Sequence, residues 1–306
     1  MVRKKLQIVV SVWIFAGLLN LFPWTQAIAK TLEVFPNVFT IVHGEGIDSN
    51  TTFIITTEGV IVVDTQATPA KAKKVMAEIR KHTQLPILYT INTHYHGDNT
   101  FGNQVFRGSK TIIAHKNVRR ALRGSAGKEY LEFFKTFKIP GLDKVTVTPP
   151  NMVFEKNMEI YAGEYYLKLI HLGLGHTDGD VFIHLPTLKA VIAGDLIFNG
   201  QFPYMRDGYV DEWIETLDYL ENEDLETVIP GHGDVGGKPI IIAMKHYLLN
   251  LKTLVRKQIE NGASLKKTKE ALRPILQEKY KSWGQRERID GNIERTYMEL
   301  SLKESS

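Results

Sequence analysis

Short runs of apolar and β-branched residues, separated by glycine, proline and polar residues, recur through most of the chain. Runs of about four to eight such residues are typical of β-strands, because branched and aromatic side chains pack well on a pleated surface. Pro86 precedes one run, and Gly59 turns the chain into another. We expect strands at residues 34–42, 52–57, 60–63, 86–92, 111–114, 165–172, 181–185, 190–193 and 227–229.

Other segments repeat their apolar residues at three- and four-residue spacing, the pattern of an amphipathic helix. Pro69 begins one such segment, since proline is well tolerated in the first helical turn. Residues 211–220 predict a second helix, capped by the side chain of its own Asp211. Residues 119–138 mix charged and aromatic side chains and fit two interpretations equally: an inserted helix and loop over a functional site, or a plain surface connection.

The last part of the chain, residues 238–306, is helical in period, with interruptions expected at Gly262 and Pro274. No linker rich in glycine, serine or proline separates this tail from the preceding strands. We therefore expect residues 30–306 to form one domain with a helical C-terminal tail.

The order of these elements restricts the fold class. A β-hairpin followed by a helix is predicted in each half of the chain, so the same unit occurs twice. A doubly wound parallel sheet needs a helix between most strands, which this chain lacks. The pattern predicts the α+β class, and the duplication suits a four-layer αββα sandwich.

The N-terminus is typical of a secretory signal peptide. Three cations at Arg3, Lys4 and Lys5 precede an apolar stretch at residues 6–22, and Ala27-Ile-Ala29 offers a cleavage site after Ala29. We expect residues 1–29 to be removed and the mature protein to be exported, to the periplasm. An uncleaved membrane anchor is the alternative, since the apolar stretch is long for a signal peptide.

Charge and cysteine content exclude several functions. The formal net charge is +4, and it falls to +1 without residues 1–29, which carry three cations and no acid. That balance gives no reason to expect a nucleic-acid partner. The chain has no cysteine, so disulfides, thiolate metal ligands and cysteine nucleophiles are absent. We expect a small-molecule substrate, and the sequence leaves the oligomeric state open.

Two imidazoles and a carboxylate stand at alternating positions in Thr93-His94-Tyr95-His96-Gly97-Asp98. They directly follow the strand expected at residues 86–92, so one loop at a sheet edge presents all three. Neutral imidazole and carboxylate are ligands that zinc accepts, usually four to a structural ion. A complete site requires further ligands from elsewhere in the chain.

Three later strands each lead to a glycine-flanked histidine or aspartate. His176 follows the run at residues 165–172, Asp195 follows residues 190–193, and His232 follows residues 227–229. The remaining histidines lack such a context, and we expect ordinary packed or solvent-facing roles for His43, His82, His115, His184 and His246. His171 lies close to His176, and we expect a structural or supporting role for it.

The ordered set of His94-x-His96-x-Asp98, Gly175-His176, Gly194-Asp195 and Gly231-His232 resembles the metallo-β-lactamase-fold hydrolases. The resemblance covers nearly the whole mature chain and implies the αββα sandwich. It also implies two zinc ions per chain, one on His94, His96 and His176 and a second on Asp98, Asp195 and His232. Asp195 would bridge the ions, a water between them would be the nucleophile, and Asp98 would act in catalysis by orienting the nucleophile or passing a proton to the leaving group.

Three positions depart from particular branches of that family. Asp195 stands where single-cysteine β-lactamases have their thiolate, and Phe198 where they commonly have a lysine that binds the substrate carboxylate. Asn99 stands where glyoxalase-type thioesterases and lactonases have a further histidine ligand, which predicts a weakened second zinc site. The mixture resembles the exported zinc hydrolases of the quinoprotein-relay group.

These observations favour a zinc-dependent hydrolase that cleaves a carbonyl ester, thioester, lactone or amide. β-Lactam amide hydrolysis and a catalytically silent metal-binding periplasmic protein are the alternatives. A redox di-iron protein is disfavoured, because His96 stands where that family has glutamate. Candidates for the pocket lining, which fit ordinary packing equally well, are Phe133, Phe134, Phe198, Phe202, Tyr204 and Met205.

Overall fold

The fold was obtained as a computed structural model that describes residues 29–43, 47–108 and 111–304. The predicted signal peptide lies outside the described residues apart from Ala29. The first strand begins directly after it, at Lys30. Within the described part of the chain, no helix combines the length and the apolar character needed to cross a bilayer.

The first sheet contains seven strands in sequential order. Its first four strands pair antiparallel, and the rest pair parallel. The predicted strand at residues 34–42 is a hairpin instead, because Pro36 and Asn37 form its turn and Asn37 takes a positive φ of 62°. The strands are β1 (Lys30–Phe35), β2 (Val38–Val42), β3 (Thr51–Ile55), β4 (Val60–Val63), β5 (Ile87–Ile91), β6 (Thr111–His115) and β7 (Met152–Phe154).

The second sheet has five strands in the order β12-β11-β10-β9-β8. All neighbours pair antiparallel except β11 and β12, which are parallel. Strands β7 and β8 were not expected from the sequence, because β7 is only three residues long and β8 alternates polar and apolar residues without a continuous apolar run. The strands are β8 (Asn157–Ala162), β9 (Tyr165–Ile170), β10 (Phe182–Leu185), β11 (Ala190–Phe198) and β12 (Thr227–His232).

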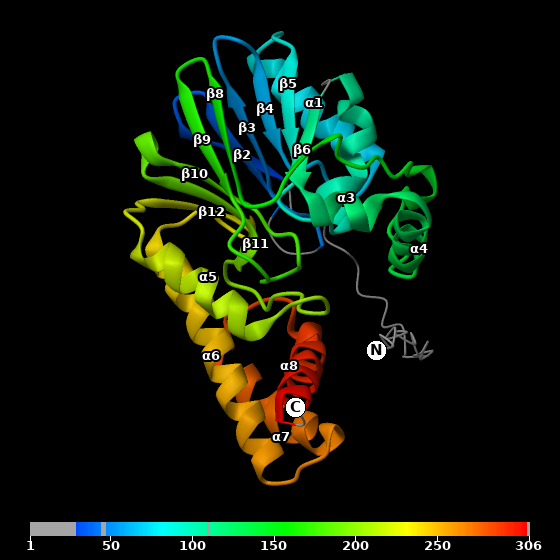
Figure 1. The fold of residues 1–306 in the computed structure, drawn as a ribbon, viewed down its shortest axis with the longest axis vertical. Helices are drawn as coiled ribbons and strands as arrows, with labels where there is room; N and C mark the ends of the chain where they lie inside the picture. The colour runs from blue at the N-terminus through cyan, green and yellow to red at the C-terminus, as the bar shows by residue number, and fades with distance from the viewer. Residues whose placement is uncertain (1–28, 44–46, 109–110, 305–306) are drawn as a thin grey trace, which may run out of the picture.

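Helices cover the outer faces of the two sheets, which pack against each other (Figure 1). Helix α1 (Pro69–His82) buries Ala72, Val75 and Ile79 against the first sheet. Helices α5 (Val210–Asn222) and α6 (Lys238–Glu260) bury Trp213 and Met244, among others, against the second. The chain therefore has the predicted α+β class and the four-layer αββα architecture.

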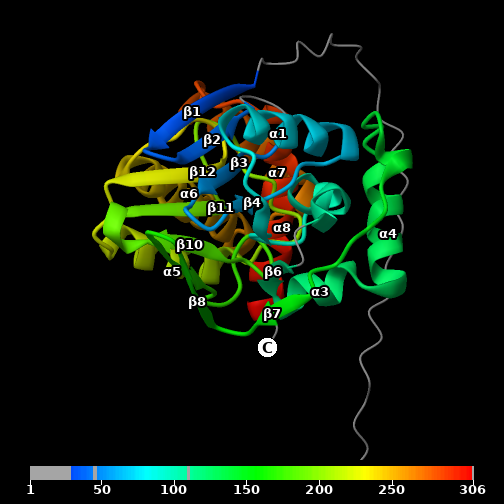
Figure 2. The same cartoon turned by 90° about the horizontal axis from the view of Figure 1, so that it is seen from above.

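Residues 116–144 form an insertion between β6 and β7. It contains α3 (Lys116–Leu122), α4 (Gly124–Lys135) and the 3-10 turn η2 (Leu142–Lys144). Helix α4 stands apart from the sheets in Figure 2, and its buried residues belong to a separate small apolar cluster. Before β6, the chain forms the short helix α2 (Gly97–Thr100), which continues into the 3-10 helix η1 (Phe101–Gly108).

The C-terminal helices extend away from the sheets, below them in Figure 1. Helix α6 is followed by α7 (Leu265–Lys279), the 3-10 turn η4 (Arg286–Arg288) and α8 (Ile289–Glu304). Gly262 separates α6 from α7, as expected, with a φ of 69°. Pro274 does not interrupt α7: it is exposed, so water can reach the carbonyl that loses its partner, while Leu272 and Leu276 are buried on either side.

Helix α5 is capped differently from the prediction. It begins at Val210 after the N-cap residue Tyr209, so Asp211 lies inside the first turn, where it pairs with Lys252 of α6. The backbone N–H of Val210 donates to Glu299 Oε2 of α8 at 2.9 Å. A carboxylate from a distant helix thus does what Asp211 was expected to do.

Candidate metal centre

The loop after β5 places the first three predicted ligands. His94 and His96 follow the strand, and Asp98 lies in the first turn of α2. Between them Gly97 is required, because a Cβ there would lie 2.4 Å from the ring of Phe101. The strand therefore fixes the histidines, and a tight turn into α2 brings the carboxylate to the same side.

The second sheet supplies the other three predicted metal ligands. His176 lies in the loop after β9, and His232 is the last residue of β12. Asp195 was expected to end its strand, but β11 continues to Phe198 through two register shifts. Gly194 takes a φ of 54° at that irregularity, and a Cβ on Gly231 would lie 2.1 Å from Asp195 Oδ1. Strands β11 and β12 can approach this closely only because glycine stands there.

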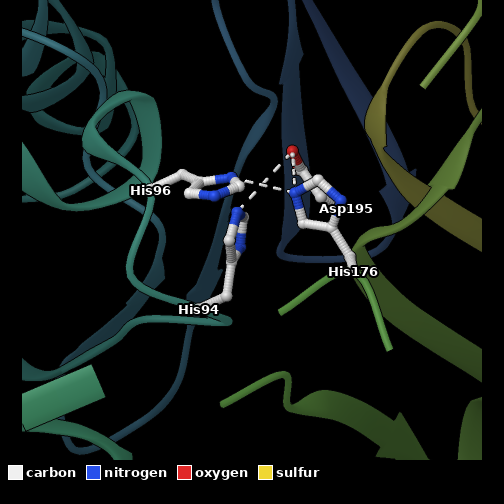
Figure 3. Close-up of side chains that lie close together, drawn as sticks. All are labelled: His94, His96, His176 and Asp195. Carbon is white, nitrogen blue, oxygen red and sulfur yellow. Dashed lines mark hydrogen bonds and ion pairs between the residues drawn. The ribbon is translucent and has the colours of Figure 1, made fainter. Parts of the chain in front are cut away.

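The six side chains form two groups of donor atoms that share Asp195. In the first group (Figure 3), His96 Nδ1 lies 2.9 Å from His176 Nε2. Asp195 Oδ2 lies 3.7 Å from His94 Nε2 and 3.5 Å from His176 Nε2. In the second group, His232 Nε2 lies 3.2 Å from Asp195 Oδ2 and 3.3 Å from Asp98 Oδ2.

The donor set fits a divalent metal ion. All six side chains are buried, with Asp98 the most exposed at 8%. His94 Nε2 and Asp195 Oδ1 are buried without a hydrogen-bond partner. Buried polar atoms without partners are costly in a folded protein, and a cation among them would satisfy their lone pairs. Imidazole and carboxylate donors are also the ligand types of such ions.

Two imidazoles of the first group are held in the neutral form that binds metal. Burial lowers the pKa of His94 to about 4 and holds the pKa of His176 well below its usual value, so both imidazoles are neutral. Burial also opposes charge on His232, but attraction to Asp195 and Asp98 outweighs it and raises that pKa to about 9. Likewise, the histidines overcome burial and keep the pKa of Asp195 well below its usual range.

One residue that supports the site was missed by the sequence analysis. His96 Nε2 donates to Asp207 Oδ2 at 3.0 Å, which leaves Nδ1 facing the other donors. Asp207 lies in the loop before α5, far from any of the motifs. A carboxylate behind a metal-ligating histidine fixes the tautomer and orientation of the ring. No local signal marked Asp207, since only the tertiary fold brings it to His96.

Comparison with known proteins settles the family. The family model of the metallo-β-lactamase superfamily matches residues 44–232, which span all six donors. The chain belongs to the metallo-β-lactamase superfamily. It is a metal-dependent hydrolase, and its buried His and Asp side chains form two groups able to hold a metal ion.

Curated relatives include the metallo-β-lactamase type 2 of Bacillus sp. (strain 170), which is 25% identical over 205 residues, or 65% of this chain and 72% of the relative. That of Elizabethkingia meningoseptica is 23% identical over 63% of this chain and 72% of the relative. A solved metallo-β-lactamase from Pontibacter korlensis superposes with a TM-score of 0.60 at 16% identity. The superposition covers 72% of this chain and 99% of that structure.

Asn99 is hydrogen-bonded to a carboxylate that supports the metal loop of this metallo-β-lactamase fold. Its side-chain amide donates to Asp64 Oδ2 at 3.0 Å, and Asp64 also accepts from the backbone and hydroxyl of Thr93. Asp64 is buried with a positive φ of 62°, and burial raises its pKa to about 7. These bonds hold the loop that carries His94 and His96.

The remaining histidines lie outside both groups of donors among the described residues. His115 and His171 stack on each other with ring centroids 3.8 Å apart, and His171 Nδ1 lies 2.8 Å from the carbonyl of Asp180. His82 packs its ring against Phe39. These contacts agree with the ordinary and supporting roles expected for them.

A pocket of about 580 Å³ opens onto the metal site, with His96, Asp98, Asp195 and His232 in its wall. Of the expected aromatic lining, Phe134, Tyr204 and Met205 are present. Phe198 and Phe202 are buried behind the wall, and Phe133 lies against Arg206. Phe134 comes from α4, so the insertion does lie beside the site rather than forming a plain surface connection.

Proposed function

We propose that this metal-dependent hydrolase uses zinc and cleaves an ester, thioester, lactone or amide bond in a small molecule. The observation that carries the proposal is the pair of buried donor groups that share Asp195 and open into one pocket. His94, His96 and His176 would hold one ion, and Asp98, Asp195 and His232 a second. Bound zinc would supply Lewis-acid chemistry, acidifying water and polarising a carbonyl oxygen.

Asp98 is the catalytic residue in this proposal. It lines the pocket, and its Oδ2 lies 3.3 Å from His232 Nε2. A carboxylate so placed can orient a water toward a bound carbonyl and then pass a proton to the leaving group.

The two ions should bind with different affinities. The first group combines three imidazoles with Asp195, whereas the second has only Asp98, Asp195 and His232. The side-chain amide of Asn99 is hydrogen-bonded to Asp64, and an asparagine there supplies no further imidazole to the second group. The proposal is therefore that the group of four donors fills first and that the group of three fills only at higher zinc concentration.

We expect the protein to hydrolyse esters, lactones and thioesters faster than β-lactams. β-Lactam hydrolysis is the second candidate, because the curated relatives are named as β-lactamases. It ranks lower because Phe198 replaces the lysine that binds the substrate carboxylate in the β-lactamases that this chain resembles. We expect β-lactam kcat/KM to lie orders of magnitude below the roughly 10⁶ M⁻¹s⁻¹ of an efficient enzyme.

A chelation experiment on purified residues 30–306 tests the function. Hydrolysis of a panel of aryl esters, thioesters, lactones and β-lactams should be lost with chelator and restored by zinc, with elemental analysis as the metal readout. His94→Ala combined with His96→Ala should abolish turnover and most bound metal, whereas His246→Ala, on the exposed face of α6, should change neither. Zinc binding without turnover on any substrate would instead identify a silent metal-binding protein. Full zinc stoichiometry in the double variant would refute the ligand assignment.

We also propose that the protein is exported and that residues 1–29 are cleaved. The first strand beginning at Lys30 supports this, because cleavage there would leave the described fold intact. N-terminal sequencing of the protein purified from the periplasmic fraction should begin at Lys30. A protein that starts at Met1 in the membrane fraction would support the uncleaved anchor instead.

A further inference from the structure

Helix α8 presents one face to the pocket. Gly291, Arg295 and Met298 line it, at the four- and seven-residue spacing that places residues on the same side of a helix. All three lie beyond residue 232, where the match to the family ends. This part of the pocket wall therefore comes from a segment outside the family match.

Apolar side chains from three segments line the pocket. Phe134, Phe137 and Ile139 come from the insertion, Met205 comes from the loop after β11, and Met298 comes from α8. Phe137 is 44% exposed and Met298 is 52% exposed, which is high for such large apolar side chains. Apolar surface gathered in a pocket favours a ligand with an apolar part.

The arginines of the wall make contacts with the protein itself. Arg288 Nη1 donates to the carbonyl of Phe202 at 3.1 Å, and Arg295 Nε donates to a backbone carbonyl at 2.6 Å. The guanidinium of Arg206 lies over the ring of Phe133, 3.6 Å from its centroid. Arginines held in this way cover the surface around them with their methylene stems, which adds to the apolar character of the pocket.

Gly291 leaves an open space in this wall. It lies in the first turn of α8 with a helical, negative φ, so its backbone does not require glycine, which is a poor helix former. Its surroundings do not require glycine either, because a Cβ there would meet no atom within 4 Å outside the backbone of its own helix. By contrast, a Cβ on Gly127 of α4 would lie 2.2 Å from the carbonyl oxygen of Leu122. What distinguishes Gly291 is the empty part of the pocket beside it.

We propose that the pocket binds an extended apolar acyl group of the substrate and that the absence of a side chain at Gly291 determines how large a group it accepts. The inference rests on the proposed hydrolase function and narrows its substrate class to esters and thioesters of apolar acids. Gly291 is then a residue that determines specificity, and it takes no part in the chemistry of the metal centre.

The extent of the pocket explains the preference for a long acyl group. The same pocket is lined by His96 and Asp98 of the metal centre and by the exposed side chains of Phe137 and Met298. A carbonyl held at the metal centre would therefore place its acyl group along apolar side chains. Each methylene group that leaves water there should raise the affinity about fourfold. Gly291→Leu would place a side chain on the pocket face of α8 and take up part of that space.

Binding of an uncharged apolar probe tests the proposal without requiring turnover. Fluorescence titration of zinc-loaded residues 30–306 with N-phenyl-1-naphthylamine would measure the Kd. We expect Gly291→Leu to raise this Kd about tenfold or more, because the added side chain and the probe compete for the same space. Gly291→Ala should change the Kd little, since one methyl group leaves most of the space open. Ala271→Leu is the matched control, because Ala271 is exposed on the neighbouring helix α7 and outside the pocket, and it should leave the Kd unchanged.

Met298→Gln provides a second test if Gly291→Leu does not fold. It keeps the length of a half-exposed side chain but makes its end polar, and it should also weaken probe binding. No saturable binding to the wild type, or an unchanged Kd in Gly291→Leu and Met298→Gln, would overturn the proposal. Equal losses in Gly291→Leu and Gly291→Ala would also overturn it, because the effect would then come from the backbone and not from the space.

Ester hydrolysis separates this inference from the function on which it rests. The kcat/KM of zinc-loaded protein should rise from p-nitrophenyl acetate to the butyrate and the octanoate, and Gly291→Leu should abolish most of that rise. Zinc-dependent hydrolysis that does not depend on acyl length would overturn the inference and leave the hydrolase function standing. Probe binding that depends on Gly291 in a protein that hydrolyses nothing on the panel would refute the hydrolase function alone.

Discussion

The ring of His96 is held by a hydrogen bond to Asp207 and by the neighbouring rings of Tyr130 and Tyr204. Its ring has two nitrogens, and the bond from Nε2 to Asp207 determines that Nδ1 faces His176 and Asp195. Burial works against the charge of the Asp207 carboxylate, but the hydrogen bond from His96 outweighs it and lowers the pKa of Asp207. Asp207 therefore stays ionised and acts on the metal centre without being one of its donors.

Asp207→Asn should lower zinc affinity by about 10- to 100-fold, because an outer carboxylate both orients the imidazole and raises its basicity. Competition with a chromogenic chelator would measure the affinity. Asp218→Asn is the control, since Asp218 pairs with Lys245 on the surface of α5. Equal zinc affinity in the wild type and the Asp207 variant would show that other contacts fix the ring of His96.

Some residues of the candidate site could be predicted from the sequence, and others could not. His94, His96 and Asp98 could be predicted because one strand and one loop place all three. Asp207 could not, because nothing near it in the chain indicates that it meets His96. The same holds for Arg288, which lines the pocket, since an exposed arginine on a surface turn has the same local sequence.

At the scale of single elements, side chains at helix ends determine where helices begin. His115 occupies the N-cap of α3 and accepts a hydrogen bond from the N–H of Asn117 at 3.4 Å. Burial, with the adjacent ring of His171, lowers the pKa of His115 to about 4. The capping imidazole is therefore neutral in the folded protein.

This pKa predicts a dependence of stability on pH. A histidine with a pKa near 6.5 in the unfolded chain and about 4 in the folded one stabilises the fold above pH 6.5. That contribution is lost as the pH falls from 6.5 toward 4, because the unfolded chain takes up the proton first. His115→Asn keeps a good capping residue without the titration, so its stability should fall less steeply across this range.

Urea denaturation of chelator-treated protein at several pH values would measure that slope, since metal loss then cannot contribute. His246→Asn, on the exposed face of α6, controls for removing a histidine. A slope in His115→Asn that matches the wild type would contradict the assignment.

Periodicity predicted most strands and helices, and its failures have physical causes. It merged β1 and β2, because the Pro36–Asn37 turn is too short to interrupt an apolar run. It ended a helix at Pro274, because the packing of Leu272 and Leu276 is not visible locally. It placed a cap at Asp211, because the carboxylate of Glu299 comes from a helix much later in the chain.

At the scale of the whole molecule, the C-terminal helices are attached to the metal site through one loop. Glu299 and Arg295 of α8 bind the backbone of Val210 and Gly208, immediately after Asp207. The loop that orients His96 thus depends on residues beyond the part of the chain matched by the family. The sheet architecture was predictable from the duplicated pattern, whereas this attachment was not.

Glu299→Ala should destabilise the folded protein by about 1–3 kcal/mol, the cost of leaving a buried backbone donor unsatisfied. Chemical denaturation would measure the free energy of unfolding. Glu299→Gln keeps an acceptor oxygen and should cost less, and Glu278→Ala, on the exposed surface of α7, should be nearly neutral. Identical stability in all three variants would show that Val210 finds another acceptor.

The candidate metal donors and part of the pocket wall come from different segments of the chain, which can therefore vary independently. The six candidate metal donors lie before residue 233, and two side chains that line the pocket, Arg288 of η4 and Met298 of α8, lie after it. Mutation or recombination in the later segment can change which molecules are accepted while every donor stays intact. A library randomised at positions 288 and 298, with Arg295 kept on the carbonyl of Gly208, should therefore yield altered substrate preferences more often than inactive enzymes.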